Sequence, residues 1–288
     1  MQKVSEDGVL ALGGGGRVAA LLKAAFQVTG ENRLIWQSRS PECGEICFDP
    51  LACDGVERMR HAMRGCSVVL ALSGVTPATG CDFSVNSELA QQVLFCADKE
   101  QMKHVFFVST SAVYGGSDRA HPEDEIPNPV SAYGGSKYEM EQVIAAYSGQ
   151  VRTTVLRLGN VAGADQLLGR VGHSGKVLLD RFPDGAFPSR SYIGPLTLAR
   201  IVTRLIDLVI AGEKLPDILN IALPGVMGMD ALLQAGNIPF QPVPAPESVI
   251  RTVMLDTGRL QDLFDFTDEM SFPGAVLEEL ACLKRALP

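Results

Sequence analysis

The sequence predicts an α/β protein in which helices cover both faces of one doubly wound parallel β-sheet. Short apolar runs rich in β-branched residues alternate with stretches of helical periodicity through the first two thirds of the 288 residues, as in repeated βαβ units. A glycine-rich turn joins the first apolar run to the first helical stretch, and hydroxyl residues follow the fifth run. Because ligands bind open parallel sheets at the carboxyl ends of strands, these features also predict a binding site.

Strands and helices can be placed in order by their periodicity. We expect strands at residues 8–12, 34–37, 46–48, 68–72, 104–108, 154–157 and 219–222, where short apolar runs are bounded by turn residues. Helices are expected at 17–26, 55–63, 86–97, 131–147 and 196–210, where apolar residues recur at helical spacing. The Gly, Pro and Arg content of 159–195 predicts a loop-rich excursion from the sheet, and 229–288 predicts short helices and a proline-rich segment at 239–246.

Composition and charge exclude several classes of function. Lys and Arg total 25 against 33 Asp and Glu, and the resulting charge of −8 does not suit a nucleic-acid partner, whose phosphates require a basic surface. Acids near the N-terminus and the lack of an apolar run of about 18 residues predict no membrane partner. Seven cysteines without an even secreted framework predict reduced thiols and a cytoplasmic protein. Cys43, Cys47 and Cys53 lack zinc-ligand spacing, so we expect no metal site.

The glycine-rich turn is the first feature that carries chemistry. Four glycines at 13–16 follow the first strand directly, and Arg17 opens a helix of strong helix formers. A strand, a glycine turn and a helix N-terminus aim backbone N–H groups and the positive end of the helix dipole at a pyrophosphate. Gly13, Gly16 and Ala19 have a G-x-x-G-x-x-A spacing, in which the small third residue lets helix and strand pack closely. We interpret the segment as a dinucleotide-binding turn, against the alternative of a merely flexible loop.

The end of the second strand indicates which dinucleotide binds. NAD-binding proteins carry an acid there for the ribose 2′-hydroxyl, whereas an Arg suits a 2′-phosphate. This strand ends in Ser38 and Arg39, which offer a hydroxyl donor and a charge-assisted guanidinium fork. We expect NADP as the cofactor. NAD stays open, because Glu42 and Glu45 follow closely and Arg39 has the alternative of a solvated loop charge.

A tyrosine and a lysine are spaced for proton transfer. Tyr133 and Lys137 lie at i and i+4 on one face of an expected helix. A phenol titrates near pH ~10, and a neighbouring ammonium lowers that pKa. Tyr133 can then exchange a proton with a carbonyl or alcohol oxygen while a nicotinamide exchanges hydride at carbon. Thr110 or Ser111, after the fifth strand, can hydrogen-bond the same oxygen; alone, such hydroxyls would be read as backbone caps.

Three segments together resemble motifs of the extended short-chain dehydrogenase/reductase family, also called the NAD-dependent epimerase/dehydratase family. They are Val-Ser-Thr-Ser-Ala-Val-Tyr-Gly at 108–115, Ser-Ala-Tyr-Gly-Gly-Ser-Lys at 131–137 and Leu-Arg-Leu-Gly-Asn-Val-Ala-Gly at 156–163, in the family's order and spacing. The resemblance implies a Rossmann-type core at 1–160 and 195–222. It also implies a small C-terminal substrate-binding lobe at 161–194 and 223–288.

The resemblance assigns roles to matched positions. Tyr133 matches the general acid/base, Lys137 its partner on the nicotinamide ribose, and Thr110 the hydroxyl on the substrate oxygen, with Ser111 in reserve. Further positions that it assigns to the cofactor are Asp49 for adenine, Ser73 and Gly74 for the nicotinamide ribose, and Asn86 at the next helix. Asn160 and Arg190 match substrate-side positions.

The predicted function follows from these assignments. Ser111 and Ala112 stand where sugar-nucleotide dehydratases of the family carry acids, so dehydration lacks its usual residues. We therefore predict an oxidoreductase that transfers hydride between a nicotinamide and a ketone or secondary alcohol, on a small carbonyl compound or a sugar. A nucleotide-sugar epimerase that holds its NAD(P) tightly and a non-catalytic NADP-sensing protein are the alternatives. The resemblance implies a homodimer through the helices expected at 86–97 and 131–147.

Overall fold

The computed structural model describes residues 7–77, 81–170 and 177–286. Its central sheet has seven strands in the order β11-β6-β5-β4-β1-β2-β3, and all neighbours are parallel. The strands are β1 (Gly8–Leu12), β2 (Leu34–Ser38), β3 (Ile46–Cys47), β4 (Cys66–Ala71), β5 (His104–Thr110), β6 (Arg152–Leu158) and β11 (Ile218–Ile221). The α/β, Rossmann-type sheet predicted from the sequence is confirmed.

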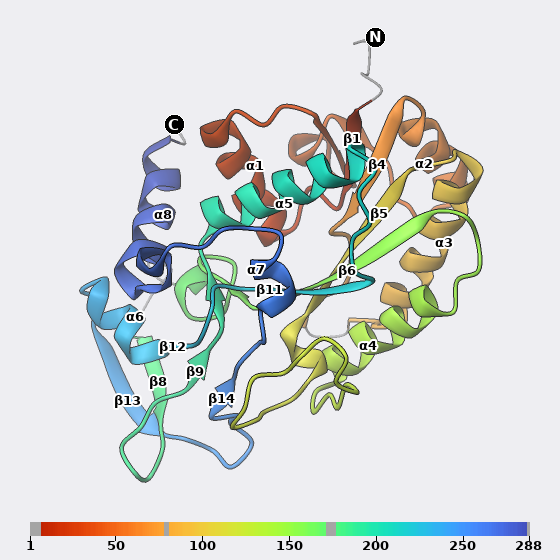
Figure 1. Cartoon of the computed structure of the whole chain (residues 1–288). Helices are drawn as coiled ribbons and strands as arrows, with labels where there is room; N and C mark the ends of the chain where they lie inside the picture. The colour runs from red at the N-terminus through yellow and green to blue at the C-terminus, as the bar shows by residue number, and fades with distance from the viewer. Residues whose placement is uncertain (1–6, 78–80, 171–176, 287–288) are drawn as a thin grey trace.

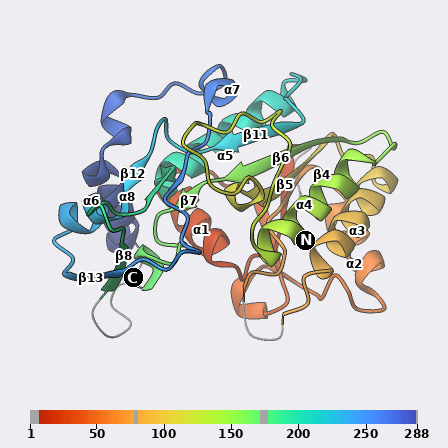
Figure 2. The same cartoon turned by 90° about the horizontal axis from the view of Figure 1, so that it is seen from below.

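Helices cover both faces of this sheet (Figure 1 and Figure 2). α1 (Arg17–Thr29) and α5 (Pro195–Ile210) pack together on one face, and α2 (Gly55–Met63), α3 (Val85–Lys99) and α4 (Ala132–Ala145) cover the other. Alternate residues of β1 separate the two cores. Val9 and Ala11 pack on the α1 side, and Leu10 and Leu12 pack on the α3 side, as the two-residue period of a strand requires.

The predicted elements differ from the structure mainly at their ends. The helix expected at 55–63 has those bounds in α2, whereas the strand expected at 104–108 continues through Thr110 in β5. The two added residues, Ser109 and Thr110, continue the ladder opposite Arg157 and Leu158 of β6. The end of a parallel strand depends on where its partner strand ends, and the hydropathy of the strand itself does not show this.

The excursion expected at 159–195 contains short strands. β7 (Asn160–Val161) pairs with β10 (Tyr192–Ile193), β9 (Ser189–Arg190) lies between β12 (Met227–Gly228) and β14 (Thr252–Val253), and β8 (Val177–Arg181) pairs with β13 (Phe240–Pro244). The prolines of β13 are tolerated because this strand has one neighbour only in the described part of the chain. Strands of two residues have no periodicity of their own, so only the paired partner defines them.

The C-terminal part adds three helices, α6 (Met229–Ala235), α7 (Gly258–Gln261) and α8 (Pro273–Ala286), and the chain also contains the 3-10 turns η1 (Pro41–Cys43), η2 (Ser111–Val113), η3 (Leu168–Arg170) and η4 (Asp268–Ser271). Glu279 of α8 accepts hydrogen bonds from the backbone N–H of Thr197, at 2.9 Å, and from its hydroxyl. A carboxylate at the first turn of α5 satisfies free N–H groups and favours the helix dipole. This contact fixes α8 against α5, which covers one face of the central sheet.

Candidate active site

The glycine turn between β1 and α1 is packed tightly on one side and open on the other. Gly13 has a φ of 90°, and a Cβ there would lie 2.5 Å from the backbone N of Ser73, so only glycine fits. Gln37 holds the turn: its Oε1 accepts from Gly13 N at 3.1 Å. Gly16 is the N-cap of α1, and a Cβ there would meet only the Gly13 carbonyl, at 3.5 Å. The open side therefore fits the approach of a phosphate.

The residues expected to choose the dinucleotide lie beside this turn. Ser38 ends β2 and is buried, and a Cβ on Gly15 would lie 3.4 Å from its Oγ. Arg39 follows it and is exposed. Asp49, assigned to adenine, is also exposed, and its Oδ1 accepts from Leu51 N at 3.0 Å. The structure thus places a hydroxyl and a free guanidinium at the ribose end of the turn.

Lys23 of α1 supports the glycine turn, and the sequence did not predict this role. Its Nζ donates to the Gly14 carbonyl at 2.7 Å and to the Cys43 carbonyl, and it lies 4.9 Å from the centre of the Trp36 ring. It therefore fastens the loop after β2 to the glycine turn. No motif marks this residue, because its two partners come from different turns.

A cavity of about 640 Å³ opens beside the carboxyl ends of the central strands. It joins residues predicted for the cofactor, the chemistry and the substrate: Gly16, Arg17, Gly74, Thr110, Tyr133, Lys137, Asn160 and Arg190 all line it. Among the described residues, the lining does not include Gly13, Ser38, Arg39, Asp49, Ser73, Asn86 or Ser111. Ser111 begins η2 and is buried, so of the two predicted hydroxyls only that of Thr110 lines the cavity.

Asn86 acts behind the cavity wall. It is 1% exposed, and its Oδ1 accepts from the backbone N of Val75 at 2.8 Å. Its Nδ2 donates to Ser136 Oγ at 2.9 Å. Asn86 thus ties the loop after β4 to α4, one residue before Lys137, and shapes the wall that a cofactor would contact.

Thr110 and Tyr133, predicted to act on the substrate oxygen, both line the cavity. Thr110 ends β5, and its Oγ1 accepts from the backbone N of Ala112 at 3.2 Å. Burial raises the pKa of Tyr133 above its ordinary value, and the Thr110 hydroxyl and the Arg17 guanidinium oppose that shift.

The net shift of the Tyr133 pKa is opposite to the one that its spacing from Lys137 predicts. The sequence predicts that the Lys137 ammonium lowers the Tyr133 pKa, but burial dominates and the net direction is upward. Lys137 is itself 5% exposed, and burial lowers its own pKa to about 8. The charge that favours the Tyr133 phenolate comes from Arg17, which opens α1. Burial removes hydration from both members of the Tyr–Lys pair, which disfavours the phenolate of Tyr133 and the ammonium of Lys137.

The far end of the cavity is polar. Arg190 donates from its guanidinium to the carbonyls of Ser189, Ile250 and Arg251 at 2.7–3.1 Å, and burial lowers its pKa. It therefore holds β9 to β14 as well as lining the cavity.

Asp165 lines the same end and was not predicted. It accepts from the Tyr192 hydroxyl at 2.9 Å and from Leu168 N at 3.1 Å. Burial raises its pKa, and these hydrogen bonds oppose the shift. Its position two residues beyond the 156–163 motif was the only signal in the sequence.

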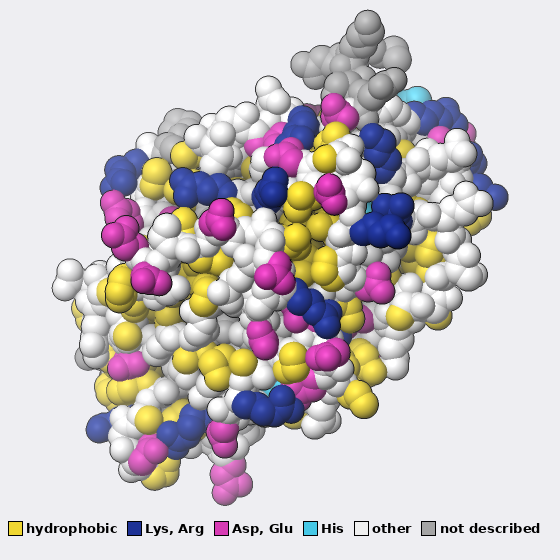
Figure 3. All heavy atoms as spheres, in the orientation of Figure 1, with side chains coloured by type: hydrophobic (Ala, Val, Ile, Leu, Met, Phe, Trp, Pro, Cys, Tyr) yellow, Lys and Arg dark blue, Asp and Glu magenta, His cyan; other side chains and the backbone are white. Residues whose placement is uncertain are grey.

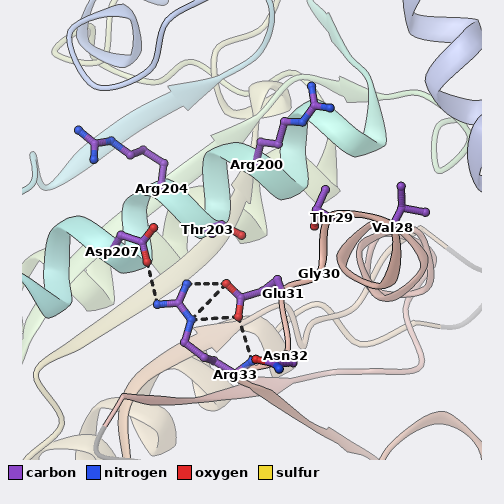
Figure 4. A pocket seen from close by; sticks show the side chains of 10 residues that line it. All are labelled: Val28, Thr29, Gly30, Glu31, Asn32, Arg33, Arg200, Thr203, Arg204 and Asp207. Atoms are coloured by element: carbon purple, nitrogen blue, oxygen red, sulfur yellow. Dashed lines mark hydrogen bonds and ion pairs between the residues drawn. The ribbon is translucent and has the colours of Figure 1, made fainter.

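A second hollow of about 620 Å³ lies at the other end of α1 and contains none of the predicted site residues (Figure 4). Arg33 donates to Glu31 at 2.9 Å and to Asp207 at 2.7 Å. Burial alone would raise the pKa of Glu31, but the hydrogen bonds from Arg33 hold it below its ordinary value. Three of the charges that line this hollow, those of Glu31, Arg33 and Asp207, thus satisfy one another.

In the described ranges, no group of three or more His, Cys, Asp or Glu side chains is placed to hold a metal ion. None of the helices within those ranges is both long and apolar enough to cross a membrane. On the face shown in Figure 3, acidic and basic side chains are interspersed.

Comparisons with known proteins agree with this geometry. The model of the NAD dependent epimerase/dehydratase family matches residues 18–200. A search of curated proteins found no significant match. Among solved structures, UDP-glucose 4-epimerase from Brucella ovis in complex with NAD has a TM-score of 0.78 at 18% identity, covering 94% of this chain and 96% of its own. MoeE5 in complex with UDP-glucuronic acid and NAD has a TM-score of 0.76 at 18% identity, covering 97% and 100%. The NDP-hexosamine 5,6-dehydratase TunA has 0.77 at 16%, covering 97% and 98%.

At these identities the solved structures establish the fold, whereas the family rests on the sequence model. That model covers more than half of the 288 residues, from the start of α1 through the first turns of α5. The match confirms the predicted enzyme class, the extended short-chain dehydrogenase/reductase type. This chain belongs to the NAD dependent epimerase/dehydratase family.

Proposed function

We propose that the protein is an NAD(P)-dependent oxidoreductase that transfers hydride between a nicotinamide and a ketone or secondary alcohol. The observation that carries the proposal is the meeting of Thr110, Tyr133 and Lys137 in one cavity with the glycine turn. The open surface at Gly16 fits a phosphate, and the cavity continues from there to the reactive hydroxyls. When bound, a nicotinamide dinucleotide would supply or accept the hydride.

The side chains divide the proton chemistry between them. Tyr133 donates its phenolic proton to the carbonyl oxygen in the reducing direction and accepts a proton in the oxidising direction. Thr110, which lines the same cavity as Tyr133, orients the same oxygen. The guanidinium of Arg17 favours the phenolate. Lys137 places an ammonium beside the reacting groups at pH values below about 8.

We propose NADP as the preferred cofactor. Ser38 and the exposed Arg39 support this choice, because a hydroxyl and a free guanidinium suit a 2′-phosphate. Two of the structural neighbours named above are NAD complexes, so NAD is the alternative. The exposed Glu42 on η1 is an acid near the same ribose position.

For the substrate we propose a polar carbonyl compound bound by the small lobe of residues 161–194 and 223–288. Asn160, Asp165 and Arg190 supply amide, carboxylate and guanidinium groups at that end of the cavity. An epimerase is the second candidate function, since UDP-sugar epimerases are among the neighbours. In that case hydride would leave one face of a carbon and return to the other.

The test combines cofactor binding with isotope transfer. The protein is titrated with NADPH and NADH by nicotinamide fluorescence, and deuterated NADPH is then offered with small ketones, keto-sugars and sugar nucleotides. We expect deuterium in the alcohol product and stoichiometric loss of NADPH. Cofactor that survives purification, with sugar inversion and no net NADPH loss, would support the epimerase instead.

The variant Tyr133→Phe separates catalysis from binding. Loss of the transferable proton should lower turnover by roughly 10²–10⁴-fold while the NADPH dissociation constant stays unchanged. Turnover that survives this change contradicts the acid/base assignment. Binding of NADPH with no turnover by the wild-type protein on any carbonyl class would favour the NADP-sensing alternative.

We also propose a cytoplasmic homodimer. All seven cysteines are free thiols, which suits a reducing compartment. α3 and α4 pack side by side, and Phe95 of α3 is 49% exposed on that pair, available to a second copy. Sedimentation of a ~31 kDa species alone, the size of one copy, would contradict the dimer.

A further inference from the structure

A buried ion pair lies directly behind the catalytic residues. Arg157 on β6 is 2% exposed, and Glu141 on α4 is 5% exposed. The Arg157 Nη2 donates to Glu141 Oε2 at 2.7 Å, and Nε donates to both carboxylate oxygens at 3.1–3.2 Å. Tyr114 completes the environment of the guanidinium with its hydroxyl, 2.6 Å from Nη1. The redox proposal above gives this pair no role.

The carboxylate of Glu141 also contacts the catalytic strand. The Ser109 hydroxyl donates to Glu141 Oε1 at 2.5 Å. Ser109 lines the cavity and immediately precedes Thr110 on β5. Glu141 therefore holds the last residues of β5, from which Thr110 reaches Tyr133.

Glu141 is also one helical turn beyond Lys137 on the same buried side of α4. Within the described part of the chain, the hydrogen-bond partner of Lys137 Nζ is Met140 Sδ, at 3.2 Å, and no carboxylate accepts from it. Burial lowers the pKa of Lys137 to about 8, and the charge of Glu141 opposes this shift. The groups around Lys137 are Tyr133 and Glu141 on α4, Ser109 and Thr110 on β5, Asn86 on α3 and Arg157 on β6.

We propose that Glu141 is a positioning residue of the active site, whose buried carboxylate keeps Lys137 an ammonium and holds the Ser109–Thr110 end of β5. The inference rests on the proposed function, because that function gives Lys137 and Thr110 their roles. A pair needed for folding alone would be matched or bettered by apolar residues of similar volume. An effect of the Glu141 charge on Lys137 explains why a carboxylate is found at this buried position.

The test follows the charge of Lys137 directly. Lysine labelled with ¹³C and ¹⁵N is titrated by NMR, with the Lys137 signal assigned from Lys137→Met. The wild-type midpoint is expected near pH 8. Glu141→Gln keeps the size and an oxygen for Ser109 but removes the charge, so Lys137 should titrate at a pH lower by about 1 or more. An unchanged midpoint in folded Glu141→Gln overturns the proposal.

Two matched variants separate charge from packing. Glu141→Asp retains the carboxylate and should bring the midpoint back to within about 0.5 of the wild-type value. Ser109→Ala removes the hydrogen bond but not the charge and should leave the midpoint in place. A Ser109→Ala shift as large as that of Glu141→Gln would mean that local packing sets the titration, which also overturns the proposal.

A third variant is needed because Glu141→Gln leaves Arg157 without its partner, and breaking a buried pair is strongly destabilising. If the single variant does not fold, Glu141→Gln with Arg157→Met removes both charges together. Lys137 should still titrate below its wild-type midpoint, and a midpoint at or above it overturns the proposal. This readout needs no substrate. Failure of the redox proposal would appear as Tyr133→Phe turnover, whereas failure of this inference would appear as an unmoved Lys137 titration.

Discussion

The two hollows at the ends of α1 have nearly the same volume, about 640 and 620 Å³, but opposite chemistry. Near Gly16 the cavity presents open glycine backbone, the hydroxyls of Thr110 and Tyr133 and a buried ammonium. Near Gly30 the charges of Glu31, Arg33 and Asp207 satisfy one another. Volume alone does not identify a functional site. In the first cavity, burial shifts the pKa values of Tyr133 and Lys137 away from their ordinary values, and such groups in a cleft mark it as the candidate site.

The largest expected difference is in NADPH binding, between substitutions of Gly13 and Gly30. Both glycines have a positive φ, and they lie at opposite ends of α1. Gly13→Ala puts a Cβ 2.5 Å from the backbone N of Ser73, so the turn must move. We expect the NADPH dissociation constant to rise by at least about 100-fold, measured by fluorescence titration. Gly30 also has a positive φ, but a Cβ there meets nothing within 4 Å. Gly30→Ala should cost about 1 kcal/mol of stability and leave NADPH binding intact; equal effects on binding would break the comparison.

A smaller difference is expected between two arginines. Arg39→Ala removes the free guanidinium at the ribose end and should weaken NADPH binding by about 10–100-fold, with NADH binding unchanged. Arg33→Ala, in the second hollow, should change neither affinity. The two titrations are run with both cofactors. Equal loss of NADPH and NADH affinity in Arg39→Ala would show that Arg39 does not contact the 2′-phosphate.

Substitutions of two cationic side chains, Lys137 and Arg33, should change the free energy of unfolding in opposite directions. The pKa of Lys137, about 8, lies below its ordinary value of 10.5, so the protonated side chain destabilises the fold below pH 8, and this cost disappears as the pH rises through 10.5. Lys137→Met should therefore abolish turnover but raise the free energy of unfolding at pH 7 by about 1–3 kcal/mol. The gain should shrink above pH 8.

Arg33→Met is the matched control for that measurement. Arg33 is paired, so its replacement should lower stability by up to about 1 kcal/mol, a small value because the Asp207 contact is exposed. Urea unfolding at pH 7 and pH 9.5 tests both variants. A Lys137→Met protein less stable than wild type at pH 7 would contradict the cost assigned to the buried ammonium.

The smallest expected effect lies at the substrate end. Asp165→Asn keeps a hydrogen-bond acceptor for Tyr192 but removes the charge from the cavity, and should change KM for the carbonyl substrate by up to about 10-fold. The NADPH dissociation constant should not change. Asp207→Asn, at the second hollow, should alter neither quantity. Steady-state kinetics that show an Asp165 effect on NADPH alone would place this carboxylate at the cofactor.

The local sequence was enough to predict the sheet, the order of its motifs and the glycine-turn end of the cavity. Strand, turn and helix of each βαβ unit are encoded by neighbouring residues, so the glycine turn and Tyr133 with Lys137 could be found from spacing. Parallel strands bring their carboxyl ends to one edge of the sheet. The meeting of Gly16, Thr110 and Tyr133 therefore followed from strand order alone.

The Arg190 end of the cavity and the charges behind Tyr133 and Lys137 became visible only in the folded chain, because they depend on contacts between distant segments. Arg190 is held by the Ile250 carbonyl, 60 residues away, and β9 and β14 contribute two residues each to their pairing. Segments of two residues have no hydrophobic periodicity, so the local sequence does not indicate which strands they pair with. The direction of the Tyr133 pKa depends on burial and on Arg17, from another helix. Desolvation and long-range contact exist only once the chain has folded, which is why spacing alone predicted the opposite shift.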